Sequence, residues 1–262
     1  MFAKSTKITG VQIKGFSDEE IKHLIIIADE DKKIKKGMLD NIIGKNDDMK
    51  HESAITLKKT TEIVRKITNI PDNESINIYL YTLGGDAMAC DILTKAILNH
   101  SGKIRVFIPE YAFSAGTMIA LASDEIYMSK NSVLGPMDPQ LQGLPVNSIL
   151  DSIKNNEDSK PSYIASFMKS FASKAQDDYN HVLEKILKTK FGDKYNTQIL
   201  ESFTQTHHHG YPIDVRELRN MGLEIRDLKV NWRDTTNVLE CDLEVDKDSI
   251  LDDSEEEKES EN

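Results

Sequence analysis

The fold is decided by a stretch that opens with Ile76-Asn-Ile-Tyr-Leu-Tyr-Thr-Leu-Gly-Gly-Asp86 and closes with Leu134-Gly-Pro-Met-Asp-Pro-Gln-Leu141. Between these segments the pattern is helix, strand, a turn bearing Ser114, a helix of small residues, and a further strand. Strands that alternate with helices in this way predict βαβ units and a mostly parallel sheet flanked by helices. We therefore expect an α/β fold with its chemistry at the carboxyl ends of the strands.

Three segments on either side of this stretch have a clear helical or capping pattern. Apolar residues recur at helical spacing over residues 53–67 and again over 162–191, which predicts two amphipathic helices. Asp214 and Glu217 are spaced as a helix capping box, with Gly222 after the end of that helix. The helix expected at residues 162–191 is the longest and lies beyond the core pattern, so it is expected to contact another subunit or to cap the sheet.

The remaining segments lead to weaker expectations. Residues 18–28 suggest a short helix, and the charged run that starts at Asp29 suggests a solvated turn. Gly102 is expected to end a helix in the left-handed conformation, and residues 143–161 are expected to form a mobile lid. A last short strand is expected at residues 223–225.

These patterns divide the chain into three parts. Residues 1–70 are expected to be helical or irregular, 71–230 to form the catalytic domain, and 231–262 to be an extension with a disordered acidic tail.

Charge is concentrated at the C-terminus. The segment 242–262 holds eleven Asp or Glu and two Lys, a net charge of -9 out of -11 for the whole chain, which leaves about -2 for residues 1–241. An acidic tail repels phosphate backbones, and no cluster of Lys or Arg elsewhere compensates for it. We therefore expect no nucleic-acid partner.

Cysteine content and apolar runs indicate the compartment. Cys90 and Cys241 are too few for a disulfide framework or a zinc site. Cys90 and Trp232 are each interpreted as packing residues. The longest early apolar run, residues 24–28, is far shorter than the roughly 20 residues of a membrane span, and the N-terminus has no signal-peptide pattern. A cytoplasmic protein without an integral membrane segment is expected.

Ser114 is the candidate nucleophile. Its position between a strand and a helix favours an N-cap role when taken alone. The surrounding Ala112-Phe-Ser-Ala-Gly116, however, resembles the strained turn that exposes a nucleophilic serine, although the first glycine of that motif is absent. The helix N-terminus offers backbone N–H groups to a developing oxyanion, Ala115 first, and the Gly84-Gly85 turn could bring a second donor close to a substrate carbonyl.

Asp138 and the triplet His207-His208-His209 are the candidate partners of that serine. Asp138 lies in a corner between two prolines, where it could cap its own turn or orient an imidazole. The histidines could form a surface loop, a metal site or the source of a general base. Adjacent histidines cannot readily all face one ion, so a metal site is disfavoured.

Four segments together resemble the serine dehydrogenase proteinase (SDH) family of Clp-fold serine peptidases. They are the Gly-Gly-Asp turn with its helix, Phe113-Ser-Ala-Gly with the following helix and strand, Leu134-Gly-Pro-Met-Asp-Pro-Gln, and His209-Gly-Tyr-Pro-Ile213. The family is related to the Clp proteolytic subunit and to signal peptide peptidase A, and the resemblance covers roughly residues 76–225. It implies the Clp/crotonase-like fold, with repeated ββα and βαβ units and a long helix after the core.

The resemblance also implies roles for particular residues. It gives a serine endopeptidase with Ser114 as nucleophile, Asp138 as the residue that orients the base, and His209 as the base. The oxyanion would be held by the N–H groups of Gly85 and Ala115. Because three histidines are consecutive, His207 and His208 stay open as alternatives for the base. The implied partners are a peptide or protein substrate and further copies of the chain in a homo-oligomer, with no metal or organic cofactor. Whether an ATPase partner is needed stays open.

Three competing hypotheses remain at this point. Lys154 or Lys160 could serve as the base of a Ser–Lys dyad of the signal peptide peptidase A type. A crotonase-like acyl-CoA enzyme would use the oxyanion hole without a Ser–His pair. A non-catalytic assembly module would keep the fold alone.

Overall fold

A computed structural model describes residues 8–33, 49–141, 144–154, 163–195, 197–204, 210–235 and 238–245. Its centre is a curled sheet of seven strands, and neighbouring strands in it are parallel except for one antiparallel pair, β13 and β14. In spatial order the strands are β1 (Ile8–Lys14), β14 (Val238–Val245), β13 (Ile225–Thr235), β8 (Glu125–Met128), β6 (Ile104–Ile108), β5 (Ile76–Tyr81) and β2 (Leu24–Ala28). The expected α/β fold with a mostly parallel sheet is confirmed.

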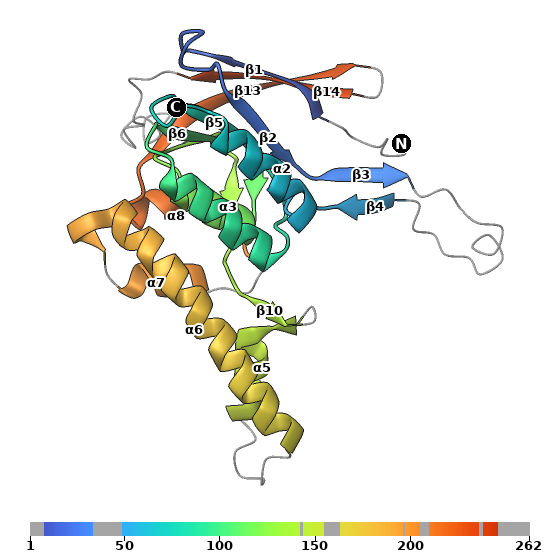
Figure 1. The fold of residues 1–262 in the computed structure, drawn as a ribbon, viewed down its shortest axis with the longest axis vertical. Coiled ribbons are helices and arrows are strands. Elements are labelled where there is room, and N and C mark those ends of the chain that lie inside the picture. Colours follow the sequence, from blue (N-terminus) through green and yellow to red (C-terminus); the bar gives the residue numbers. More distant parts are fainter. Residues whose placement is uncertain are drawn as a thin grey trace, which may run out of the picture.

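Helices and three small sheets surround this centre (Figure 1). The helices are α2 (Leu57–Thr68), α3 (Ala87–Asn99), α4 (Ala115–Ala122), α5 (Val146–Lys154), α6 (Tyr163–Phe191), α7 (Thr197–Thr204) and α8 (Val215–Asn220), with the short 3₁₀ helix η1 (Gly192–Lys194). The small sheets are β12 (Ile213–Asp214) with β9 (Val133–Leu134) and β7 (Tyr111–Ala112), β10 (Gln140–Leu141) with β11 (Leu144–Pro145), and β3 (Glu30–Lys33) with β4 (Met49–Glu52).

The two faces of the large sheet are covered differently. Along β5, Ile76, Ile78 and Leu80 belong to a core shared with the helices, while Tyr79 belongs to a second core formed largely by strands. In the second core, the rings of Phe107 and Tyr127 stack at 4.9 Å. Burial on both faces explains why β5 reads as a nearly continuous apolar strand.

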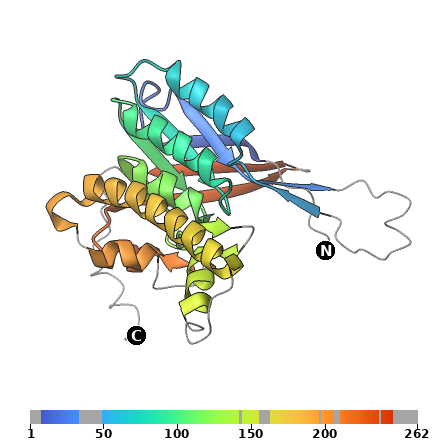
Figure 2. The ribbon, with the colours of Figure 1, turned by 60° about the horizontal axis from the view of Figure 1, so that its bottom comes forward.

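The long helix α6 leaves the core at one end. Figures 1 and 2 show it running from α7 and the core toward α5 and the β10–β11 pair. Its second half is held in the core by Leu183, Ile186 and Leu187. Its first half carries exposed aromatic residues, among them Tyr163 and Phe167. The expected long helix is therefore present, with one half packed and the other half exposed.

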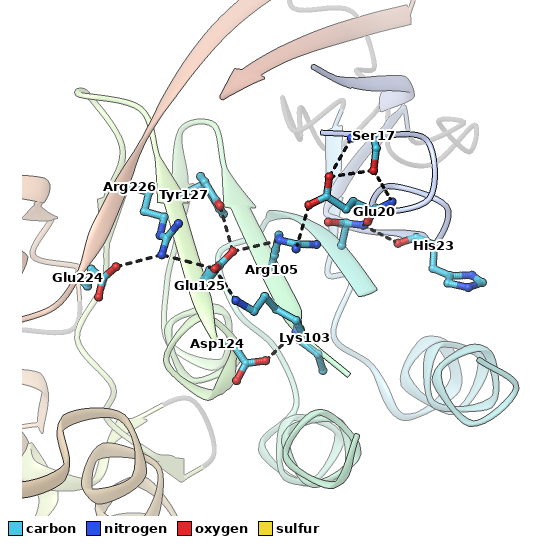
Figure 3. A network of polar contacts seen from close by, with 12 residues as sticks. Ser17, Glu20, His23, Lys103, Arg105, Asp124, Glu125, Tyr127, Glu224 and Arg226 are labelled. Carbon is cyan, nitrogen blue, oxygen red and sulfur yellow. Dashed lines mark hydrogen bonds and ion pairs between the residues drawn. The ribbon is translucent and has the colours of Figure 1, made fainter. Parts of the chain in front are cut away.

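A network of ion pairs occupies the amino ends of β6, β8 and β13 (Figure 3). The Glu125 carboxylate lies 2.9 Å from Lys103 Nζ, 3.1 Å from Arg105 Nε and 3.5 Å from an Arg226 nitrogen. Burial raises the pKa of Glu125, but these cations and the Tyr127 hydroxyl outweigh it and hold the pKa below its usual range. Chemistry in parallel sheets lies at the carboxyl ends of the strands, so we interpret this network as structural.

Two expectations for the first hundred residues are wrong. Residues 24–28 form strand β2 instead of the end of a helix, because Ile25 and Ile27 point into the core and the β-branched run favours a strand. Gly102 is not left-handed. It is required by close packing instead, since a Cβ atom there would lie 2.1 Å from the Glu74 carbonyl oxygen.

After residue 140 the structure describes part of the expected lid, whose mobility stays a prediction, and corrects the expected final strand and tail. Part of the expected lid, Val146–Lys154, is helix α5, anchored by the buried Val146. Of the expected final strand at 223–225, only Ile225 lies in a strand, as the first residue of the eleven-residue β13. This strand forms a hairpin with β14, so residues 242–245 are strand and not tail. Residues 246–262 lie outside the described residues. The division of the chain at residues 70 and 230 stays a prediction.

Candidate active site

The backbone of Ser114 is strained. Its φ of 52° and ψ of -114° make it the one non-glycine residue with positive φ in the described part of the chain. It precedes α4 in the N-cap position, but its side chain makes no capping hydrogen bond. Such a conformation costs roughly 1–3 kcal/mol and persists only where the surroundings enforce it. The N-cap interpretation therefore does not account for this serine, whereas the strained turn of a nucleophile does.

The Gly84-Gly85 turn lies against this serine. Gly84 has a φ of 112°, and a Cβ atom there would lie 2.9 Å from Ser114 Cβ. A Cβ atom on Gly85 would lie 2.2 Å from the Ile55 carbonyl oxygen. A larger side chain at Gly84 would push the glycine turn away from the serine turn, and one at Gly85 would push it away from Ser53 and Ile55. The glycine turn therefore packs against the serine turn, while its predicted approach to a substrate carbonyl stays a prediction.

Two backbone N–H groups are available beside Ser114. Ala115 is the first residue of α4, so its N–H has no partner within the helix. The Asp86 N–H donates to the Ile55 carbonyl at 2.9 Å, while the Gly85 and Ala115 N–H groups donate to no other described residue. This arrangement can accept an oxyanion, as the sequence predicted for these two donors.

Asp138 lies in a loop that is fastened to the serine turn. Its side chain is buried, with 9% of its surface exposed. The Thr117 hydroxyl of α4 lies 2.9 Å from the Ala112 carbonyl oxygen and 2.8 Å from that of Gly135. The Phe113 ring packs directly on Gly135, where a Cβ atom would lie 2.1 Å from the ring. Strand pairing between β7 and β9 adds to this connection, so Ser114 and the Asp138 loop are held together.

The histidine triplet lies outside the described residues, so His207, His208 and His209 are not placed. The described residues that flank it are held beside the Asp138 loop. The Met137 N–H donates to the Phe203 carbonyl at 2.7 Å. On the other flank, Ile213 pairs with Leu134 through β12 and β9. Phe203 and Ile213, which lie on either side of the triplet in the sequence, are therefore both held near the Asp138 loop.

The structure describes only one of the two candidate lysines. Lys154 is exposed at the end of α5, and Lys160 lies outside the described residues. Burial lowers the pKa of Lys190 to about 8, which would suit a base. Its Nζ, however, donates to the carbonyls of Ser123 and Asp124 at the other end of α4. Eight helical residues separate that end from Ser114, or about 12 Å at 1.5 Å per residue.

The sequence interpretation missed Asp29. It was assigned to a solvated turn, but its side chain is only 6% exposed. Its carboxylate accepts hydrogen bonds from the N–H groups of Ala54 and Leu83 and from the Thr82 hydroxyl, at 2.6, 2.8 and 2.8 Å. The error follows from missing β2: once β2 is a parallel strand, Asp29 stands at its carboxyl end, where polar residues of a site gather.

Cys90 lies behind the site. Its Sγ is 3.5 Å from the Ala115 carbonyl oxygen, and burial raises its pKa to about 12. A buried thiol with a raised pKa is a poor nucleophile, so the packing role is confirmed. Within the described ranges, no cluster of three or more His, Cys, Asp or Glu side chains could hold a metal ion. None of the helices in those ranges is both long and apolar enough to cross a membrane.

Comparison with known proteins gives a family that fits this geometry. The family described as ClpP-like SDH-type serine proteinase matches residues 17–240. "Uncharacterized protein MJ0137" of Methanocaldococcus jannaschii is 34% identical over 172 residues, which are 65% of this chain and 60% of that protein. "Uncharacterized protein MJ1495" of the same organism is 36% identical over 172 residues, 65% of this chain and 59% of that protein. The chain thus spans less than two thirds of the length of these relatives. Its fold and the match over residues 17–240 show that it belongs to the family of ClpP-like SDH-type serine proteinases.

Proposed function

We propose that this protein is a serine peptidase that cleaves peptide bonds through an acyl-enzyme on Ser114. In this proposal His209 is the general base and Asp138 orients it, while Gly85 and Ala115 stabilise the oxyanion. The strained backbone of Ser114 is the observation that carries the proposal, because a serine that served only as a helix cap would have no need of it. Family membership supports the same chemistry.

The mechanism follows from acyl-transfer chemistry. The base takes the Ser114 Oγ proton as that oxygen attacks the substrate carbonyl, and the Gly85 and Ala115 N–H groups hold the oxyanion. The base then gives its proton to the leaving amine. Water attacks the ester that remains and releases the acid, with the base again taking a proton. The Asp138 carboxylate fixes the tautomer of the imidazole and stabilises the imidazolium. No metal or cofactor takes part.

The substrate is proposed to bind as an extended strand. The short strands β10 and β11 directly follow Asp138, so a peptide added to their edge would pass close to Ser114. Leu144 of β11 is exposed and would meet an apolar side chain of such a peptide.

The base is tested by substitution, with hydrolysis of a p-nitrophenyl ester and of an unstructured protein as readouts. His209→Ala is expected to reduce kcat by about 10⁴-fold or more, because Ser114 then has no proton acceptor. His207→Ala and His208→Ala are the matched controls and are expected to keep activity within a few-fold of wild type. Activity that survives all three histidine changes and is lost in Lys154→Ala or Lys160→Ala would replace the triad with a Ser–Lys dyad.

Self-assembly is the second part of the proposal. Four exposed apolar side chains lie along the first half of α6: Tyr163, Ile164, Phe167 and Phe171. Phe167 and Phe171 are one helical turn apart, and their rings stack at 6.3 Å. Apolar rings on an exposed helix face are typical of an interface. We propose that α6 packs on another copy of the chain.

A further inference from the structure

Ser53 makes a short hydrogen bond to the glycine turn. Its hydroxyl donates to the Gly84 carbonyl oxygen at 2.6 Å and accepts from the Ile55 N–H at 3.0 Å. Ser53 precedes α2 and is distant in sequence from both Gly84 and Ser114. Ser53 is not among the residues proposed above for the acyl transfer.

The carbonyl that Ser53 holds belongs to the peptide group that also carries the Gly85 N–H. A trans peptide is planar, so its C=O and N–H point in opposite directions. Fixing the Gly84 carbonyl on Ser53 therefore fixes the direction of the Gly85 N–H away from Ser53. Without that bond the carbonyl would keep only a longer contact of 3.2 Å to the Thr82 hydroxyl, and neither glycine has a Cβ atom to restrict its φ and ψ.

The other side of the same turn is fixed by Asp29 and Thr82. The Thr82 hydroxyl lies 2.8 Å from the Asp29 carboxylate and accepts from the Gly84 N–H at 3.0 Å. The same hydroxyl is 3.2 Å from the Gly84 carbonyl oxygen. A hydroxyl has one proton, and the shorter contact assigns that of Thr82 to Asp29. Ser53 is thus the principal donor to the Gly84 carbonyl.

We infer that Ser53 is a positioning residue for the oxyanion hole: it holds and polarises the Gly84–Gly85 peptide so that the Gly85 N–H is directed at the reacting carbonyl oxygen. This inference rests on the proposed function. A hydrogen bond to the carbonyl also strengthens the N–H of the same peptide as a donor, because linked hydrogen bonds polarise one another. Ser53 contacts no reacting atom in this account and acts only through Gly85.

The loss of kcat in Ser53→Ala cannot exceed the loss expected if the Gly85 N–H donor were removed altogether. Loss of one oxyanion donor reduces kcat by about 10²–10³-fold, and a donor that is present but poorly oriented loses part of this. We expect Ser53→Ala to reduce kcat by roughly 10–100-fold with KM nearly unchanged, because the oxyanion forms after the substrate has bound. Ser53→Thr keeps the hydroxyl and is expected to restore most of the rate.

The test compares Ser53→Ala, Ser53→Thr and Thr56→Ala in the whole chain. Thr56 is the matched control, because its hydroxyl accepts from the Lys59 N–H at the start of α2 and has no part in the glycine turn. The probes are p-nitrophenyl acetate, which has few contacts besides its carbonyl, and a fluorophosphonate, whose phosphoryl oxygen occupies the same hole. The readouts are kcat, KM, the rate constant of labelling and the thermal midpoint.

The outcomes separate the two proposals. A loss of kcat and of labelling rate in Ser53→Ala, with wild-type KM and the protein still folded at the assay temperature, recovery in Ser53→Thr and no such loss in Thr56→Ala, would support the inference. Wild-type rates in Ser53→Ala, while Ser114→Ala is inactive, would overturn the inference and leave the proposed function standing. Equal losses in Ser53→Ala and Thr56→Ala, in step with melting, would assign Ser53 to stability alone. A wild-type protein that neither labels nor hydrolyses would overturn the proposed function and this inference with it.

Discussion

At the scale of single residues, the site depends on backbone conformations that a sequence does not display. The position of Ser114 between a strand and a helix of small residues could be recognised, but its φ of 52° could not. For Asp29 the sequence was misleading for a different reason. Its role depends on the contacts of Ala54 and Thr82, which are distant in the sequence, so a charged run hid a buried carboxylate.

The strain at Ser114 predicts an order of stability for two variants. Ser114→Gly is expected to exceed Ser114→Ala in free energy of unfolding by about 1 kcal/mol, because glycine tolerates positive φ and alanine does not. Ser123, at the other end of α4, is the control: its φ of -80° suits alanine, so Ser123→Ala should exceed Ser123→Gly. Urea unfolding measures both pairs. The same order at both sites would contradict strain at Ser114.

At the scale of elements, the helices and caps that depend on neighbouring residues were predicted well, and the contacts between separate elements were not. The predicted helix of small residues after Ser114 is present as α4, and the capping box of Asp214 and Glu217 is present in α8. Each is set by neighbouring residues. The three-stranded sheet of β12, β9 and β7 was not predicted, because each strand has two residues and exists only through its partners.

Thr117 provides a test of how α4 fastens the two loops of the site. Thr117→Val keeps the shape but removes a hydroxyl that can donate its one proton to the Ala112 or the Gly135 carbonyl and accepts from the Gly135 N–H, so a loss of about 1–3 kcal/mol in the free energy of unfolding is expected. Activity should fall as well, because Ser114 and Asp138 are then less firmly held. Thr117→Ser keeps the hydroxyl and should lie much closer to wild type. Equal stability of the valine and serine variants would contradict this role.

Lys190 of α6, which is partly buried against the end of α4, predicts a pH dependence of stability. Burial lowers its pKa to about 8 in the folded state, below the ordinary value of 10.5. Between these values the unfolded chain binds more protons than the folded one, so this lysine makes the free energy of unfolding rise with pH, by up to about 1.4 kcal/mol per unit. Below pH 8 both states are charged and the contribution is flat.

The measurement compares wild type with Lys190→Met by urea unfolding from pH 7 to pH 10. Other groups, such as Cys90 and Cys241, titrate in both proteins and cancel in the difference. The wild type should gain stability relative to the variant above pH 8. A constant difference would show that Lys190 keeps an ordinary pKa.

At the scale of the whole molecule, one edge of the large sheet is formed by strands from the two ends of the described chain. Strand β1 pairs with β14, so that Ile8 lies opposite Leu239. The acidic composition after residue 241 suggested a tail, yet Cys241, Leu243 and Val245 alternate into the second core. A pairing between strands more than two hundred residues apart leaves no local signal in the sequence. This is why the central strands were predicted and the pairing of β1 with β14 was not.

The exposed rings of α6 predict the effect of a charge on assembly. Phe167→Asp is expected to shift the protein to a smaller species in light scattering at micromolar concentration, because a carboxylate would be buried at the proposed contact. Lys174→Glu changes the charge of another exposed residue of the same helix and should leave the size unchanged. A wild-type protein that is already monomeric would contradict the proposed contact.

The most direct test of the central claim is the mass-spectrometric mapping of fluorophosphonate labelling on wild type, Ser114→Ala and His209→Ala. An activated serine reacts with this probe because a base removes its proton and the oxyanion hole holds the phosphoryl oxygen. The account predicts labelling of wild type at Ser114 alone, and its loss in both variants. Labelling of another residue, or none in a folded wild-type protein, would contradict the claim that Ser114 is the nucleophile of a serine peptidase.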